Sequence, residues 1–281
     1  MKTMMKWMAA IGLAGVALSC AALDFGDLEK TLKKELPVNP KVVDAVKDLK
    51  GPDEAEEIAI GRQIAGNLLG AAPLVKDAKL QKYVNQVGEW VASQSERPDL
   101  PWHFGVIQSE DVNAFAAPGG YIFVTAGLYR LLQNEADLAG VLGHEIGHVI
   151  RKHHLKLLQQ SKLVDLGGKA LSKQAGGNDK VQQLIGSGAE IVARSLDKDA
   201  EFEADRIGVV LATRAGYDAY GLPEVLQQIG HFSKDDGSVA LLFKTHPLPE
   251  DRLARLDSAM GDRFDRVKGL DVSSRFYRPK K

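Results

Sequence analysis

Five consecutive residues near the middle of the chain carry the side chains of a metal hydrolase: His144-Glu145-Ile146-Gly147-His148. In a helix, residues four apart lie on one face, so both imidazoles can point at a single ion. Glu145 is then placed to reach a water molecule beside that ion. Two imidazole ligands and a general base at this spacing are typical of a zinc hydrolase.

The residues around this motif predict a helix. Asn134 is a suitable N-cap, and Asp137 follows it with the spacing of a capping box. Apolar residues then recur at helical spacing: Leu138, Val141, Leu142, Ile146 and Val149. Three glycines in the helix, Gly140, Gly143 and Gly147, indicate either a closely packed neighbour or room for an ion and substrate. His153 and His154 are expected to cap the end of the helix or face solvent there.

A third ligand is expected from a second helix that contains an acidic run. Glu201 and Asp205 are four residues apart and share one face, so Glu201 can complete the ligand set. Asp205 can accept a hydrogen bond from a ligand imidazole and fix its tautomer. Glu203 points elsewhere and is expected to be solvated. The whole run could instead be a solvent-exposed face, but the apolar stretch 207–212 favours a buried helix. Two imidazoles and a carboxylate favour one Zn²⁺ per chain.

These motifs resemble a known family. The chain contains His144-Glu145-Ile146-Gly147-His148 and then Glu201-Phe202-Glu203-Ala204-Asp205. Before these two motifs come the segment Asp111 to Ala116 and Gly119-Gly120, and after them come Thr245-His246-Pro247 and Arg252. It is similar to the zinc peptidases that include HtpX and the CAAX prenyl proteases, and most similar to the soluble periplasmic members typified by BepA and LoiP. The resemblance covers roughly residues 52–257.

The resemblance implies an α+β fold, a mainly helical zincin-type metallopeptidase domain with a small β-sheet beside the motif helix. Helices are predicted from Pro52 to about Leu69 and from Asp77 to Gln94, and a strand from Trp102 to Ile107. A second strand is predicted at Tyr121, Ile122, Phe123 and Val124, after the Gly119-Gly120 turn signal. In such peptidases an extended substrate pairs with an exposed edge strand beside the metal, and this second strand is the candidate. A plain hairpin strand is the alternative.

His246 is the second candidate catalytic residue after Glu145. It could stabilise the oxyanion of the transition state. It could instead bind the zinc as a fourth ligand and hold the enzyme inactive, which the resemblance to BepA-like members suggests. A structural histidine before a proline is the third interpretation, and the sequence leaves all three open.

The N-terminus has the features of an export signal. Lys2 and Lys6 are followed by the 12-residue apolar stretch from Trp7 to Leu18, which is short for a membrane span. Cys20, the only cysteine, stands where a bacterial lipoprotein is lipidated. Cleavage near Ala21 or Ala22 without lipidation is the alternative.

We therefore predict a lipoprotein-type signal peptide at 1–20, a tether or short helices at 21–51, and a zinc metallopeptidase domain at 52–281. The Gly-rich and Lys-rich insertion from Ser161 to Gly188 is interpreted either as a lid over the site or as a surface loop. The net charge of −1 gives no sign of a nucleic-acid surface. No run of 18 apolar residues occurs after the N-terminal stretch, so the only membrane association expected is the lipid anchor.

The function predicted from these features is zinc-dependent endopeptidase activity in the periplasm, at the outer membrane, on misfolded or misassembled envelope proteins. The alternative is a chaperone-like assembly factor for outer-membrane proteins with latent protease activity. A zinc hydrolase of peptidoglycan amides is a third possibility. In the first two cases the partners are unfolded or outer-membrane polypeptides.

Overall fold

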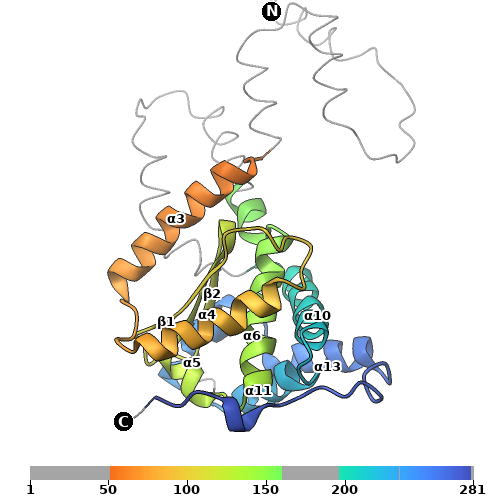
Figure 1. Ribbon diagram of the computed structural model, residues 1–281. Coiled ribbons are helices and arrows are strands. Elements are labelled where there is room, and N and C mark those ends of the chain that lie inside the picture. The colour runs from red at the N-terminus through yellow and green to blue at the C-terminus, as the bar shows by residue number, and fades with distance from the viewer. Residues whose placement is uncertain (1–50, 160–195, 234, 280–281) are drawn as a thin grey trace, which may run out of the picture. The chain divides into compact units, whose positions relative to one another are not determined.

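The computed structural model describes residues 51–159, 196–233 and 235–279 (Figure 1). From residue 52 on these belong to one compact unit, Pro52–Lys281. The predictions for the signal peptide, Cys20, the tether and the insertion from Ser161 to Gly188 fall wholly or almost wholly outside the described residues. Within the described residues, no helix has the length and apolarity needed to cross a membrane.

The described residues form a mainly helical domain with one small sheet, which confirms the predicted α+β class. The elements in chain order are α3 (Glu54–Ala71), α4 (Ala78–Ala92), β1 (His103–Ile107), β2 (Ala114–Ala117), the 3-10 turn η1 (Pro118–Gly120), β3 (Tyr121–Thr125), α5 (Ala126–Leu131), α6 (Glu135–Ile150), α10 (Lys198–Arg214), α11 (Gly221–Gly230), the turn η2 (Gly237–Val239), α12 (Ala240–Thr245), α13 (Pro249–Met260) and the turn η3 (Ser273–Arg275).

The helix starts follow local capping chemistry. Asp53 caps α3, and its side chain and that of Glu56 form a reciprocal capping box. Pro52 therefore lies before the cap and not in the first turn, where the sequence had placed it. Asp77 caps α4, and Asn134 caps α6 by accepting a hydrogen bond from the Asp137 N–H.

The three strands are ordered β1-β3-β2, with β1 parallel and β2 antiparallel to β3. The predicted edge strand, Tyr121 to Val124, is therefore the central strand, and that prediction is wrong. β2 lies at the edge. Its sequence, Ala114-Phe115-Ala116-Ala117, is short and lacks alternating polarity, so it gave no strand signal. The η1 turn joins β2 to β3. Gly119 in this turn has a φ of 74°, which residues with a side chain rarely adopt.

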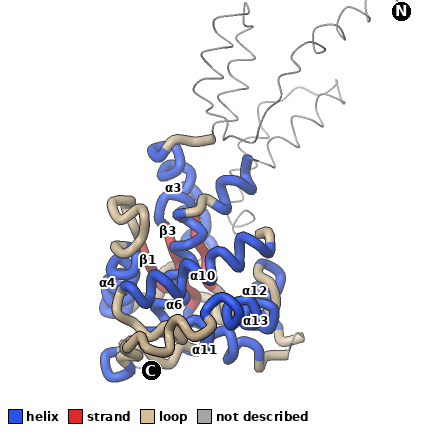
Figure 2. Tube along the Cα trace, turned by 90° about the vertical axis from the view of Figure 1, so that its right-hand side faces the viewer, coloured by secondary structure: helices blue, strands red, loops and turns tan. Residues whose placement is uncertain are grey.

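α6 and α10 lie side by side with unusually close backbones (Figure 2). A Cβ added to Gly143 of α6 would lie 2.8 Å from the Gly208 carbonyl oxygen of α10. A Cβ on Gly208 would lie 2.7 Å from the backbone nitrogen of His144. The glycine cluster thus marks a closely packed neighbour, and this contact brings the acidic run over the histidine motif.

The motif helix lies in the core, since every residue of α6 from Glu135 to Val149 is buried. Leu138, Leu142 and Ile146 are fully buried in the main hydrophobic cluster, which also contains side chains of α4 and the sheet. Burial of this helix fixes its orientation, and with it the direction in which both histidines point.

Candidate metal centre

α6 places both motif histidines on one buried face. The Nε2 atoms of His144 and His148 lie 3.1 Å apart. The two side chains are almost completely buried. Burial also lowers the pKa of both imidazoles, so that both are neutral near pH 7. A neutral imidazole is the form that binds a metal.

α10 adds a carboxylate to this face. One oxygen of Glu201 lies 3.4 Å from His148 Nε2 and the other lies 3.8 Å from His144 Nε2. Both oxygens are buried, and neither has a hydrogen-bond partner within the described residues. A buried carboxylate without donors is costly, and burial raises the pKa of Glu201 well above its usual range. A cation between these groups would remove that cost.

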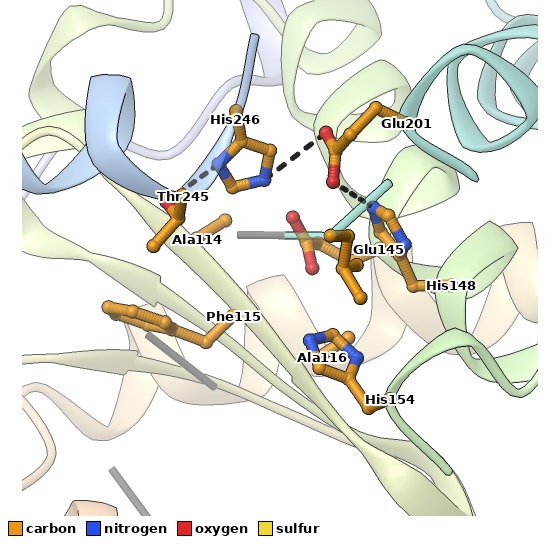
Figure 3. A pocket seen from close by; sticks show the side chains of 10 residues that line it. Ala114, Phe115, Ala116, Glu145, His148, His154, Glu201, Thr245 and His246 are labelled. Carbon is orange, nitrogen blue, oxygen red and sulfur yellow. Dashed lines mark hydrogen bonds and ion pairs between the residues drawn. The ribbon is translucent and has the colours of Figure 1, made fainter. Parts of the chain in front are cut away.

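A third histidine completes the cluster. His246 follows α12 and its Nε2 lies 3.7 Å from Glu201, while its Nδ1 is 2.9 Å from the Thr245 hydroxyl (Figure 3). Ligand atoms of His144, His148, Glu201 and His246 all lie within 4.8 Å of one another. Atoms bound tetrahedrally to one zinc ion lie roughly 3.3–3.6 Å apart, so the spacing of these four fits a shared metal ion.

Asp205 contacts His144 on the side of the ring that faces away from the cluster. Its Oδ1 lies 2.8 Å from His144 Nδ1, which leaves Nε2 facing the cluster. The guanidinium of Arg252, from α13, binds both oxygens of Asp205, with 2.9 Å from Nε to Oδ2. Burial alone would raise the pKa of Asp205, but Arg252 and His144 hold it well below its usual range. Asp205 is thus an ionised acceptor at neutral pH.

Glu145 lies beside this cluster and is buried. Burial raises its pKa to about 8, with the Arg252 charge acting in the opposite direction. A carboxyl with a pKa near neutrality can both take up and release a proton, as a general base and acid must. Glu145 lines the same cleft as His148, Glu201 and His246 (Figure 3).

The cleft at the cluster is bounded on one side by the edge strand β2. It encloses about 250 Å³, part of it open to solvent, and is lined by Ala114, Phe115, Ala116, Glu145, His148, His154, Leu196, Glu201, Thr245 and His246 (Figure 3). No residue of Tyr121 to Val124 lines it. The strand beside the candidate metal centre is therefore β2.

A second cavity adjoins the first and is mostly apolar. It encloses about 340 Å³, again partly open, and shares Ala114, Glu145 and His246 with the first. Its remaining lining is Leu128, Val141, His144, Leu222, Val225, Leu226, Ile229, Leu242 and Arg252. Glu145 thus lines both the cleft along β2 and the apolar cavity that α11 borders.

Comparison with known proteins identifies the family of this chain. The family model of peptidase family M48 matches residues 78–260, which include every residue of the cluster. The chain belongs to peptidase family M48. This confirms the resemblance seen in the sequence motifs.

Among curated relatives, the beta-barrel assembly-enhancing protease of Escherichia coli is 32% identical over 209 residues, 71% of this chain and 42% of the relative. The protein of the same name from Yersinia pestis is 32% identical over 207 residues, 71% and 43% of the two chains. The mitochondrial metalloendopeptidase OMA1 of Arabidopsis thaliana is 27% identical over 187 residues, 66% and 37%. The matches thus span less than half of each of these relatives.

Several residues near the centre differ from their sequence interpretation. α6 ends at Ile150, and a new helical segment, 153–159, begins with His153 and His154. Both are buried, so the expectation that they face solvent was wrong. Glu203 is only partly exposed and binds Arg151 and His153. The expectation missed these contacts because a left-handed residue between the two helices, Lys152 with φ 57°, turns the chain back.

Arg252 was noted in the sequence only as part of the family resemblance. Nothing in the spacing of α13 pointed to Asp205, which lies 47 residues earlier in the chain. Arg252 is only 4% exposed, which is unusual for arginine, and its hydrogen bonds to Asp205 make it part of the site.

Proposed function

We propose that this chain is a zinc-dependent endopeptidase of the bacterial cell envelope that hydrolyses peptide bonds of misfolded or misassembled envelope proteins. One observation carries the proposal: three ligand groups from α6 and α10 converge beside a buried carboxyl, Glu145, at a cleft that an edge strand borders. Family membership and the names of the relatives support a peptide substrate and an envelope client.

In this proposal His144, His148 and Glu201 bind one Zn²⁺, and Asp205 positions His144. A bound zinc ion supplies Lewis acidity, which acidifies a water molecule and polarises a carbonyl. Glu145 accepts the proton of the attacking water and then donates it to the leaving amine.

The substrate is proposed to bind as an extended strand against β2. Within the described residues β2 pairs with no strand other than β3, and three of its residues, Ala114, Phe115 and Ala116, line the cleft. Main-chain hydrogen bonds to such an edge select extended or unfolded chains without reading their sequence. The adjoining apolar cavity would take an apolar side chain next to the scissile bond.

The proposed location is the periplasm, with an outer-membrane anchor on Cys20. This rests on the lipoprotein-type signal in the sequence and on the relatives named for β-barrel assembly. The chain would reach the membrane only through that anchor.

The decisive experiment compares metal content and casein hydrolysis of the protein and its Glu145→Gln variant. We expect one zinc per chain in both proteins and hydrolysis only by the unsubstituted protein, at least 10²-fold above the variant, because Gln cannot accept the proton. Chelation should abolish hydrolysis and zinc should restore it. A fully active Glu145→Gln protein would overturn the proposal, and digestion of cell-wall peptides but not casein would redirect it to peptidoglycan.

A second candidate function is assembly of outer-membrane proteins with the protease held latent. The position of His246 favours it, because its Nε2 lies among the ligand atoms and could fill the fourth coordination position. Zinc with four protein ligands has no open position for water.

If His246 holds the enzyme inactive, His246→Ala should raise casein hydrolysis several-fold without loss of zinc. If His246 instead stabilises the oxyanion, the same variant should lose about 10²-fold in turnover with an unchanged melting temperature. Activity equal to that of the unsubstituted protein would assign His246 a structural role only.

A further inference from the structure

The Nδ1 atoms of the two motif histidines, which face away from the metal cluster, have different partners. His144 Nδ1 faces a carboxylate directly, at 2.8 Å from Asp205. His148 Nδ1 instead faces another imidazole, with 2.9 Å to Nδ1 of His153. The opposite nitrogen of His153, Nε2, lies 3.3 Å from Oε2 of Glu203. A chain of two imidazoles therefore connects the metal cluster to a carboxylate.

The direction of these hydrogen bonds follows from what a ligand must do. A neutral imidazole that offers the lone pair of Nε2 to a metal carries its hydrogen on Nδ1. His148 must then donate from Nδ1, and His153 can accept at Nδ1 only when its own hydrogen is on Nε2. That hydrogen points at Glu203, a pure acceptor when ionised. Both tautomers are thereby determined, and the chain ends on a negative charge.

Three features of the fold hold this chain of groups in place. His153 is buried at 5% exposure against His148. Lys152 adopts φ 57°, which ends α6 and turns His153 back onto it, and the Lys152 ammonium binds the buried Glu57 at 3.0 Å. Glu203 lies two residues after Glu201 on α10, and its second oxygen forms an ion pair with Arg151, 3.0 Å from Nε. One helix thus supplies a candidate ligand and the end of the hydrogen-bond chain.

We propose that His153 and Glu203 are positioning residues that orient His148 for the metal, in the way that Asp205 orients His144. Neither residue touches the cleft water or the substrate in this proposal; they act through His148. The inference rests on the proposed function only in that the cluster binds zinc. Groups that orient a ligand imidazole typically contribute 10–100-fold to metal affinity.

The test measures zinc affinity by competition with a chelator for two substitutions at His153. Phe keeps a buried ring of similar shape but makes no hydrogen bond, whereas Gln can accept from His148 and donate to Glu203. We expect His153→Phe to weaken zinc binding by about 10–100-fold and His153→Gln to recover most of it. The cobalt-substituted proteins should show the same order, with a shifted visible spectrum only in the Phe variant.

The matched pair for the carboxylate is Glu203→Ala and Glu96→Ala. Glu96 also binds Arg151, at 2.9 Å, but has no contact with His153. We expect Glu203→Ala to weaken zinc binding several-fold and Glu96→Ala to leave it unchanged. Melting temperatures of the metal-free variants separate lost folding from lost metal affinity.

Nitrogen NMR of the zinc-loaded protein tests the proposal without any substitution. We expect the proton of His148 on Nδ1 and that of His153 on Nε2. The opposite tautomer at His153, or equal zinc affinity in His153→Phe and His153→Gln, would overturn the proposal that His153 and Glu203 orient His148. Absence of zinc binding by the unsubstituted protein would instead overturn the proposed function, so the two failures are distinguishable.

Discussion

At the scale of single residues, the candidate centre is a set of buried polar groups. The free-energy cost of burying each group is offset only while its partners are present. The carboxylate of Asp205 is buried with its partners His144 and Arg252, and each of the three has a partner among the other two. Such a set is sensitive to the loss of any member, because a buried charge without a partner costs several kcal/mol.

Arg252→Met should therefore destabilise the metal-free protein by about 3 kcal/mol, because Asp205 is left buried without its cation. Zinc affinity should fall as well, since Asp205 would no longer be fixed behind His144. Urea unfolding of the metal-free protein and chelator competition measure the two effects.

Arg255 provides the control in the same helix. Its guanidinium lies 4.9 Å from the Phe202 ring and contacts no carboxylate of the centre. Arg255→Met should change stability by less than about 1 kcal/mol. Similar losses in both variants would show that α13 depends on its arginines in general and not on the pair with Asp205.

At the scale of elements, the approach of α6 to α10 decides whether the third ligand reaches the first two. Gly143 and Gly208 permit this approach, because a methyl group at either position would collide with backbone atoms of the partner helix. Backbone cannot move aside as a flexible side chain can. The glycines therefore serve the geometry of the centre as well as helix packing.

Gly143→Ala should cost about 1–3 kcal/mol of unfolding free energy, because it forces the helices apart. It should also weaken zinc binding, since Glu201 moves away from His144 and His148. Gly66→Ala is the matched control: Gly66 lies inside α3 with no atom within 4 Å of the added methyl group. That variant should be more stable by about 0.5–1 kcal/mol with unchanged zinc affinity. A fully stable, zinc-binding Gly143→Ala protein would contradict the packing argument.

At the scale of the whole domain, a buried carboxylate at the start of α6 joins distant parts of the chain. Glu135 accepts hydrogen bonds from Tyr83 at 2.7 Å and Tyr217 at 2.8 Å, and it binds Arg275 near the C-terminus. The segment after α13 is thus packed onto α6.

The Glu135 contacts predict a pH dependence of stability. Burial alone would raise the pKa of Glu135, but Arg275 and the two tyrosines lower it below its ordinary value of 4.5. A carboxyl with a depressed pKa stabilises the fold above its unfolded pKa, and this contribution is lost as the pH falls through its folded pKa. Glu135→Gln should therefore cost about 2 kcal/mol at pH 7.

The difference in unfolding free energy between the two metal-free proteins should shrink progressively below about pH 4.5, because the unfolded carboxyl then takes up a proton while the native one is still ionised. It should be lost once the pH falls through the lower folded pKa. Denaturant unfolding at several pH values measures it. A difference that stays constant down to the lowest accessible pH would show that shape and not charge makes Glu135 important.

The sequence by itself determined the parts of this protein that depend on local order along the chain. Helical periodicity places His144 and His148 on one face, and the same rule pairs Glu201 with Asp205. The cap at Asn134 also follows from a local pattern, because capping involves residues only a few positions apart. The α+β class was implied by the family resemblance of several such motifs.

Only the tertiary structure decided what depends on residues far apart in the chain. The sheet order made β2 the edge strand and β3 the centre, because pairing partners are chosen by the fold and not by the strand itself. The fold likewise brought Arg252 to Asp205, His246 to Glu201 and Glu203 to His153. A polar side chain shows its partner only after burial removes water as the alternative, so these contacts have no signature in the sequence.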